Sequence, residues 1–318
     1  MSPKLLLKRA LQISLIAILA YFVGLIILLG AMGVAYLYPP LFVLGLALKQ
    51  DTNLCSISES FHGARGLVKL RRESERLAEE CKLLEEDSEG YQLWGTPLGS
   101  WWIPTGSEES LPILLEQQEL NIYGDSADGV RDEDVVLDCG AHVGLFTEKA
   151  LAMGARLVVA IEPSPKNLEC LRRNLRNSID QGKVVIVPKG VWNQEDQLIL
   201  HTYDFNTAAD SFVIQGERSK GEVKVPLTTI DHLVQELELE KVDVIKMDIK
   251  GAVGRALEGS KNTIAHHSPR LVISTEEKED PPMEIASQVR SLNPAYNLSC
   301  GLCAADNYRV FPLVLFFQ

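Results

Sequence analysis

Residues 135–163 of the chain read VVLDCGAHVGLFTEKALAMGARLVVAIEP. Two short apolar runs, at 135–137 and 157–161, enclose a turn with two glycines and a stretch with the composition of a helix. This order predicts strand, turn, helix and strand, which together make one right-handed βαβ unit. The chain is therefore expected to be an α/β protein built on a parallel sheet.

The turn after the first strand predicts a nucleotide site with an unusual glycine spacing. Gly140 and Gly144 are four residues apart, and His142 stands where a G-x-G-x-x-G motif has its middle glycine. Asp138, just before the turn, disfavours a pyrophosphate but suits an ammonium group. Glu162 ends the next strand, about 20 residues past the first glycine, where an acid commonly binds ribose hydroxyls. S-adenosylmethionine fits this pattern, and a glycine turn without a nucleotide is the alternative.

The rest of the chain continues to alternate strands with helices, which predicts a doubly wound, Rossmann-like sheet. Further strands are expected at 184–187, 242–247 and 270–274, an antiparallel excursion at 197–226, and an antiparallel final pair at 297–303 and 310–317. Ligands in such sheets bind beyond the carboxyl ends of the strands. One crevice is therefore expected to hold Asp138, Glu162, the turn at 190–192, Asp248 and the segment after Ser274.

Length and charge limit what the chain can be. With 318 residues and a net charge of −12, it lacks the basic surface that broad nucleic-acid binding requires, so no nucleic-acid partner is expected. The composition divides the sequence into a transmembrane anchor at 1–50, a helical stalk at 51–90 and a catalytic domain at 91–318.

The N-terminal segment predicts a single membrane-spanning helix. Residues 10–48 contain no charged side chain, and residues 11–31 are long enough to cross a bilayer. Basic residues occur on both sides of this span, so charge orients it weakly. Because S-adenosylmethionine is made in the cytoplasm, the catalytic domain is expected to face the cytoplasm. A hairpin through Pro39 and Pro40 is the alternative topology.

A short heptad seam follows the membrane segment. Apolar residues step by three and four between 67 and 84, which predicts a helix that packs on its own domain. Self-association through this helix is the alternative.

The six cysteines give no sign of a metal site. Cys139 and Cys170 fall in predicted core elements and are expected to be buried thiols. Cys300 and Cys303 have the spacing of a metal or redox pair, but no second pair lies nearby, which favours two ordinary thiols.

Five segments together resemble the FkbM family of S-adenosylmethionine-dependent methyltransferases: VVLDCGAHVGLFT, IEPSPKNLECLRRNL, VPLTTID, VDVIKMDIKGA and PRLVIS. The resemblance covers roughly residues 115–318. It implies methylation of a hydroxyl group, often on a sugar, a glycan or another natural product. It also implies cofactor contacts: Asp138, Gly140 and Gly144 to the methionine part, Glu162 to the ribose, and Gly190 and Trp192 to the adenine. His142 is a further candidate, for the cofactor's carboxylate.

The acceptor side departs from the family pattern. The signature Asp-(Val/Ile)-Glu-Gly-Ala-Glu stands here as DIKGAV at 248–253, with Lys250 and Val253 in place of both glutamates. Asp248 is the candidate catalytic base or acceptor-orienting group, and a strand-end cap is the alternative. Lys250 is expected to pair with Asp248, lower its pKa and favour an anionic acceptor.

The sequence thus predicts a membrane-anchored methyltransferase that acts on a hydroxyl of a sugar, a glycan or a lipid-linked acceptor. The alternative is a degenerate methyltransferase fold that serves as a cofactor-binding or interaction module at the membrane.

Overall fold

The computed structural model describes residues 54–203, 207–213, 221–305 and 310–318, together with residue 21 and residues 43, 44 and 46–48. Within these ranges no helix is both long enough and apolar enough to cross a membrane. The span predicted at 11–31 lies outside the described residues, apart from residue 21.

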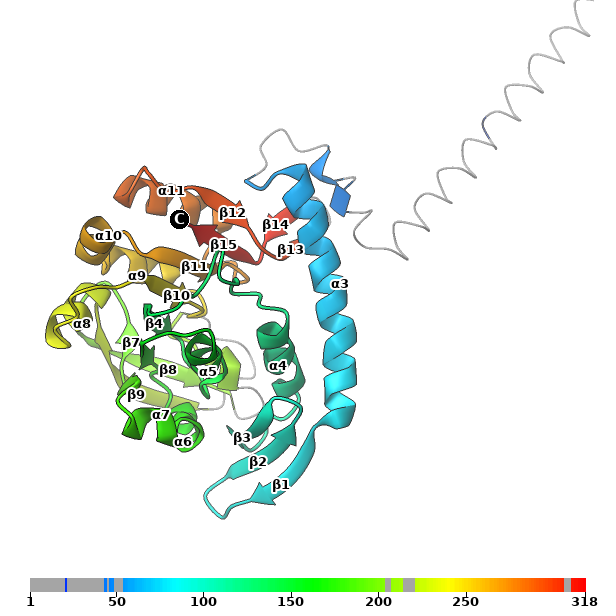
Figure 1. The fold of residues 1–318 in the computed structure, drawn as a ribbon, viewed down its shortest axis with the longest axis vertical. Helices are drawn as coiled ribbons and strands as arrows, with labels where there is room; N and C mark the ends of the chain where they lie inside the picture. Colours follow the sequence, from blue (N-terminus) through cyan, green and yellow to red (C-terminus); the bar gives the residue numbers. More distant parts are fainter. Residues whose placement is uncertain are drawn as a thin grey trace, which may run out of the picture.

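A seven-stranded sheet forms the centre of the domain (Figure 1). All its neighbouring strands pair in parallel except at β15, which is antiparallel to both of its neighbours. The predicted doubly wound α/β sheet with an antiparallel final strand is confirmed. In spatial order the strands are β12 (Leu298–Cys300), β15 (Val314–Phe317), β11 (Arg270–Ser274), β10 (Val244–Met247), β4 (Val135–Cys139), β5 (Leu157–Ile161) and β6 (Val184–Val187).

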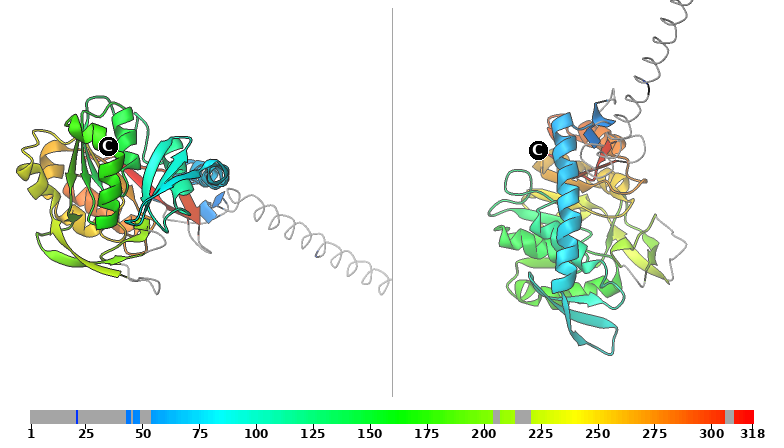
Figure 2. Two further views of the ribbon diagram at one scale, coloured as in Figure 1. Left: turned by 90° about the horizontal axis from the view of Figure 1, so that it is seen from below. Right: turned by 90° about the vertical axis from the view of Figure 1, so that its right-hand side faces the viewer.

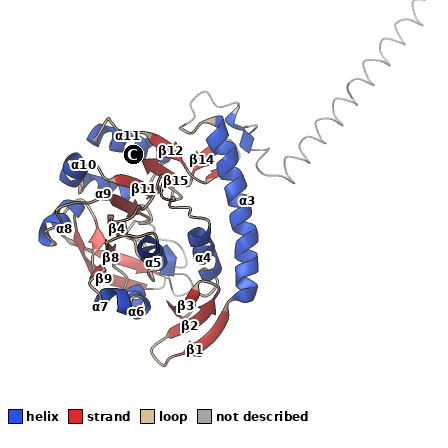
Figure 3. Ribbon diagram, viewed as in Figure 1, coloured by secondary structure: helices blue, strands red, loops and turns tan. Residues whose placement is uncertain are grey.

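Helices cover both faces of this sheet (Figure 3). The apolar runs are buried on both sides, as parallel strands between two helical layers require. One layer packs on Leu137 and Ile245, the other on Val136 and Val244. The helices of the first layer are α8 (Ile230–Glu236), α9 (Val253–Glu258), α10 (Lys261–His267) and α11 (Pro282–Leu292). The second layer contains α5 (Leu145–Ala152) and α6 (Pro165–Asn174), which is followed by α7 (Arg176–Asp180).

The segment before the central sheet folds onto the domain. Helix α3 (Ile57–Glu80) packs against α4 (Leu111–Glu119) and β13 (Cys303–Ala305), and runs along one side of the molecule (Figure 2). Leu70 and Leu77 of the heptad seam are buried in the domain's own core clusters. This agrees with a helix that packs on its own domain.

The helix is shorter than the predicted stalk. It ends at Glu80, and an antiparallel sheet follows, made of β1 (Lys82–Glu86), β2 (Tyr91–Thr96) and β3 (Gly99–Pro104). The expectation that helix continues to residue 90 is wrong, because 82–86 pair with β2 instead. Strands β2 and β3 form an antiparallel hairpin that carries Trp94, Trp101 and Trp102.

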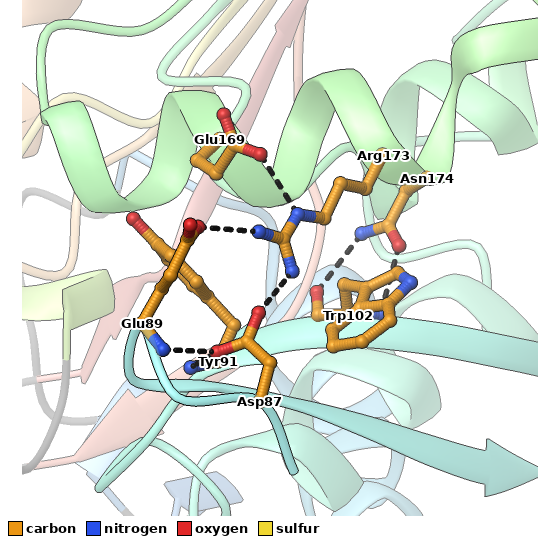
Figure 4. Close-up of polar contacts among 7 residues, drawn as sticks. All are labelled: Asp87, Glu89, Tyr91, Trp102, Glu169, Arg173 and Asn174. Carbon is orange, nitrogen blue, oxygen red and sulfur yellow. Dashed lines mark hydrogen bonds and ion pairs between the residues drawn. The ribbon is translucent and has the colours of Figure 1, made fainter. Parts of the chain in front are cut away.

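Arg173 of α6 fastens this small sheet to the domain (Figure 4). Its guanidinium donates to Asp87 at 2.5 Å, to Glu89 at 3.2 Å and to Glu169 at 2.8 Å. It also stacks on Tyr91 and Trp102, with ring centroids 4.6 and 4.7 Å away. Charge and aromatic packing therefore act together at this junction.

The predicted antiparallel excursion is present between β6 and α8. Strand β7 (Gly190–Val191) pairs with β9 (Gly221–Thr228), which pairs antiparallel with β8 (Gln197–Thr202). The described part of the β8–β9 connection contains a 3₁₀ turn, Thr207–Ala209. This turn reaches the carboxyl edge of the central sheet, where it helps to line a cavity.

A disulfide joins Cys55 to Cys300, across 245 residues of sequence. The prediction of an ordinary thiol at Cys300 is therefore wrong. Strand β13 pairs with β14 (Val310–Pro312). The first turns of α3 pack closely against the turn before β13: a Cβ atom at Gly63 would lie 2.5 Å from the backbone oxygen of Gly301. This packing brings Cys55 to β12. Cys139, Cys170 and Cys303 are buried free thiols.

Candidate functional site

A cavity of about 110 Å³ lies beyond the carboxyl ends of β4, β5 and β10. This is the edge at which doubly wound sheets bind their ligands. The cavity brings together five of the predicted site residues: Gly140, His142, Glu162, Gly190 and Asp248. Asp138, Gly144 and Trp192 are not among its lining residues.

Glu162 is the acidic centre of the cofactor side. Its carboxylate accepts hydrogen bonds from the backbone N–H of His142 at 2.9 Å, from that of Ser164 at 2.9 Å, and from Asn167 Nδ2 at 3.2 Å. Burial raises the pKa of Glu162 to about 7, although these hydrogen bonds act in the opposite direction. The carboxyl group therefore changes its charge near neutral pH.

Asn167, which the sequence argument missed, stands beside Glu162 in the cavity wall. Its Oδ1 atom is buried and has no hydrogen-bond partner within the described part of the chain. An unpaired buried acceptor costs stability unless a donor reaches it. The hydroxyls of a ribose are such donors, so Glu162 and Asn167 fit the sugar of S-adenosylmethionine. Asn167 lies in the first turn of α6, which follows Glu162, and this position could have predicted it as a site residue.

The two glycines of the turn serve the packing of the turn itself. Gly140 has φ of +81°, and a side chain there would collide with the backbone oxygen of Asp248. Gly144 has φ of +97° and caps α5, where a side chain would come within 2.8 Å of Leu171. Gly140 lines the cavity, whereas Gly144 holds the turn against α6.

Asp138 is fully buried beneath the turn, and its predicted bond to the cofactor's ammonium is not supported. Lys246 lies 2.9 Å from Oδ1, and the Thr147 hydroxyl donates to Oδ2 at 2.7 Å. Lys246 also donates to the backbone oxygen of Gly140 at 2.8 Å. Asp138 thus positions Lys246, and Lys246 supports the turn. The Lys246 ammonium already pairs with the Asp138 carboxylate, so this carboxylate is not available to the ammonium of the cofactor.

His142 enters the cavity in a left-handed conformation, with φ of +51°. Its Nε2 atom lies 3.1 Å from the hydroxyl oxygen of Thr207. Burial, with help from the nearby Lys246 charge, lowers the pKa of His142 to about 4. The ring is therefore neutral at pH 7, so it can contact a carboxylate only through a hydrogen bond. Its predicted cofactor contact stays a prediction.

Of the turn at 190–192, Gly190 lines the cavity as predicted, whereas Trp192 does not. Gly190 lines the cavity, and a side chain there would come within 2.5 Å of the Phe212 ring. Trp192 lies outside the lining and packs edge-on against Phe212, with 6.2 Å between ring centroids. Phe212, which was not predicted from the sequence, contributes a phenyl ring to the cavity lining.

Asp248 lies on the acceptor side, between Tyr123 and Lys250. Tyr123 donates to Oδ2 at 2.9 Å, and the Lys250 ammonium lies 3.3 Å from Oδ1. Burial would raise the pKa of Asp248, but Lys250, Lys246 and the Tyr123 hydrogen bond together lower it well below the usual range. Asp248 is therefore ionised and a weak base, and the predicted pairing with Lys250 is present.

Lys250 lies close to three carboxyl groups, where only Asp248 was predicted from the sequence. Besides Asp248, the carboxylates of Glu276 and Glu277 each lie 3.7 Å from its ammonium. One cation among three carboxyl groups attracts no further anion, so the reason to expect an anionic acceptor is removed. Within the described ranges, no group of three His, Cys, Asp or Glu side chains is arranged to hold a metal ion.

One protein-family model and several solved structures resemble this chain. The family model described as "Methyltransferase FkbM domain" matches residues 138–294. No curated protein matches the sequence significantly. Among solved structures, the methyltransferase FkbM from Methylobacillus flagellatus KT is 17% identical, with a TM-score of 0.46 over 80% of this chain. The chain spans only 60% of that protein.

Two more distant structures have lower TM-scores. The precorrin-6y C5,15-methyltransferase from Geobacter metallireducens GS-15 is 14% identical, with a TM-score of 0.37, over 64% of this chain and 86% of its own. The SAM-dependent methyltransferase from Agrobacterium tumefaciens is 14% identical, with a TM-score of 0.39, over 75% of this chain and 69% of its own. The match of the family model to residues 138–294 identifies the chain as one that contains a methyltransferase domain of the FkbM family, which implies S-adenosylmethionine as its cofactor.

Proposed function

We propose that this protein transfers the methyl group of S-adenosylmethionine to a hydroxyl of a sugar, a glycan or a lipid-linked acceptor. The observation that supports this most is a single cavity lined by Glu162 and Asn167 on one side and Asp248 on the other. Glu162 and Asn167 offer hydrogen-bond acceptors that suit the ribose hydroxyls of the cofactor. Asp248 offers a carboxylate that suits the hydroxyl of the methyl acceptor.

The cofactor supplies an activated methyl group, and the chain supplies alignment. Methyl transfer is an in-line displacement, so the protein acts mainly by orienting the two reactants. Glu162 and Asn167 would hold the ribose, while Gly190 and Phe212 would flank the adenine. Asp248 would accept a hydrogen bond from the acceptor hydroxyl and direct its lone pair. Held by Tyr123 and Lys250, it would orient this group more than deprotonate it.

The charges at the acceptor side favour a neutral acceptor. Lys250 is already surrounded by three carboxyl groups, so a phosphate or carboxylate would meet net negative charge. Neutral hydroxyls can instead donate hydrogen bonds to these carboxylates. The proposal therefore puts an uncharged sugar ahead of a phosphorylated one.

The proposal includes a membrane anchor. Residues 10–48 have no charged side chain, and the span at 11–31 has the length that a bilayer requires. An anchor would hold the enzyme near lipid-linked or membrane-borne acceptors.

A non-catalytic role is the second candidate, and one observation favours it. Both oxygens of Asp248 are already occupied, by Tyr123 and by Lys250, where relatives are expected to have an acid in place of the lysine. A chain of this kind would bind the cofactor without turning it over.

Methyl transfer by the solubilised full chain separates the two candidates. The assay supplies S-adenosylmethionine labelled in the methyl group, with neutral sugars, glycans and lipid-linked sugars as acceptors, and phosphorylated sugars for comparison. We expect label in a neutral acceptor and loss of transfer in Asp248→Asn with cofactor affinity retained. Cofactor binding without transfer to any acceptor would instead support the non-catalytic role.

A further inference from the structure

A glycosylation motif lies on the surface of the domain. Asn297-Leu298-Ser299 has the N-x-[ST] pattern, with a middle residue other than proline. Asn297 is exposed and comes just before β12. Its backbone exchanges hydrogen bonds of 2.8 and 3.0 Å with Gln318. The sheet therefore holds the backbone of this asparagine while its side chain stays accessible.

The motif lies away from the cavity. β12 is an edge strand, and Leu298 stands opposite Phe317 of β15, which stands opposite Leu271 of β11. Asn297 is thus level with the amino end of β11. Since the cavity lies beyond the carboxyl ends of β4, β5 and β10 of the same sheet, a large group on Asn297 would leave the cavity open.

The disulfide points to the same cellular side as the motif. Cys300 directly follows Ser299 and is bonded to Cys55. Disulfides persist in the oxidising lumen of the secretory pathway and outside the cell, and are rare in the cytosol. Asparagine-linked glycans belong to secreted proteins and surface loops. Two unrelated chemical features, one residue apart, therefore agree on a non-cytoplasmic location.

The charges that flank the predicted span agree as well. Lys4, Lys8 and Arg9 precede residues 11–31, whereas Lys49 is the one basic residue in the roughly 20 positions after it, the range over which flanking charge orients a span. Lysine and arginine favour the cytoplasmic side. Counted over these nearest positions, the charges weakly favour an amino-terminal flank in the cytoplasm and a domain on the opposite face.

We propose that Asn297 is N-glycosylated and that the domain beginning near residue 54 lies on the non-cytoplasmic face of the membrane. The co-reactant is an oligosaccharide carried on a lipid diphosphate. The carboxamide nitrogen of Asn297 forms a bond to sugar C1, while the bond from C1 to the diphosphate oxygen breaks. The nitrogen loses one proton, and the departing lipid diphosphate retains the bonding electron pair.

This location has a consequence for the cofactor. The expectation of a cytoplasmic domain rests on where S-adenosylmethionine is made. A domain on the other face needs the charged cofactor to be carried across the membrane. The inference rests on the disulfide, the motif and the proposed anchor, and is independent of whether methyl transfer occurs.

The test is translation of the full chain in the presence of sealed endoplasmic-reticulum microsomes. We expect a slower-migrating band that peptide N-glycosidase removes, and a domain that added protease digests only after detergent. Asn297→Gln and Ser299→Ala should abolish the slower band, while Ser299→Thr, which preserves the motif, should retain it. On gels without reductant, Cys55→Ser should migrate differently from the wild type, and reductant should abolish that difference.

Three results would overturn the proposal. A wild-type chain without the slower band whose domain is digested in sealed microsomes would refute both parts. A protected domain without the band would refute glycosylation at Asn297, as would a band that persists in Asn297→Gln. None of these readouts requires cofactor or acceptor, so failure here is distinct from failure of the methyltransferase assay.

Discussion

The charge of Asp138 stabilises the buried Lys246 ammonium. Mutations can distinguish this structural role from direct binding of the cofactor. Asp138→Asn leaves the Lys246 ammonium buried without its carboxylate partner. Breaking such a pair costs about 3–5 kcal/mol of stability. We expect Asp138→Asn to lower the free energy of unfolding by that order and to weaken cofactor binding, because the turn at Gly140 loses its support.

The double variant Asp138→Asn with Lys246→Met distinguishes support from contact. It removes both charges, so much of the stability should return. The turn still lacks the Lys246 hydrogen bond to the Gly140 backbone oxygen, so the double variant should bind S-adenosylhomocysteine as weakly as the single variant Lys246→Met. Chemical denaturation and calorimetric titration measure the two quantities. If the double variant binds clearly more weakly than Lys246→Met alone, Asp138 contacts the cofactor directly and the assignment of a supporting role is wrong.

Lys250 is expected to set the acid limit of activity. Lys250→Met removes the nearest cation from Asp248, so the pKa of this carboxyl group should rise towards or above its ordinary value near 4. Asp248 must be ionised to accept the acceptor's hydrogen bond. The acid limb of the rate profile should therefore move to higher pH. Lys278→Met, an exposed lysine in the loop after β11, is the matched control and should leave the profile unchanged. Coincident wild-type and Lys250→Met profiles would contradict this role.

At the scale of elements, the junction between α6 and the β1–β3 sheet depends on Arg173. Its stacking on Tyr91 and Trp102 is worth about 0.5–2 kcal/mol, to which the partly exposed ion pairs add little. Arg173→Ala should lower the thermal midpoint. Arg76→Ala, which removes exposed ion pairs on α3 without aromatic stacking, should change it less. Equal midpoints for the two variants would show that the stacking contributes nothing.

The central elements were predictable because their apolar runs are continuous and their ends carry acids or glycines. Strand β1 was not, because all five of its residues are exposed and only pairing with β2 makes it a strand. Glu162 and Asp248 could be placed from the strand ends alone. Lys246 could not, since its partner depends on register: it lies directly opposite Asp138 on the neighbouring strand.

At the scale of the whole molecule, the chain before the family-matched region completes the site. Leu114 and Gln117 of α4 line the cavity, and Tyr123 donates to Asp248. Helix α3 supports this segment along its length, from the disulfide at one end to the β1–β3 sheet at the other (Figures 1 and 2). Such contacts join residues far apart in sequence, and local patterns do not encode them. The Cys55–Cys300 disulfide was missed for the same reason.

The central claim is that this cavity binds S-adenosylmethionine through Glu162. Burial raises the pKa of this carboxyl group to about 7 in the free protein, above its ordinary value of 4.5. Ribose hydroxyls donate to the ionised form, so binding favours loss of the proton. Affinity should therefore rise with pH, and with this pKa about tenfold between pH 6 and pH 8.

The deciding measurement is calorimetric titration of the solubilised full chain with S-adenosylhomocysteine at pH 6 and pH 8. The wild type should bind saturably and more tightly at pH 8. Glu162→Gln, which keeps the shape but not the charge, should bind more weakly and almost independently of pH. No saturable binding by the wild type, or equal and pH-independent affinities in both proteins, would contradict the assignment of this cavity as the cofactor site.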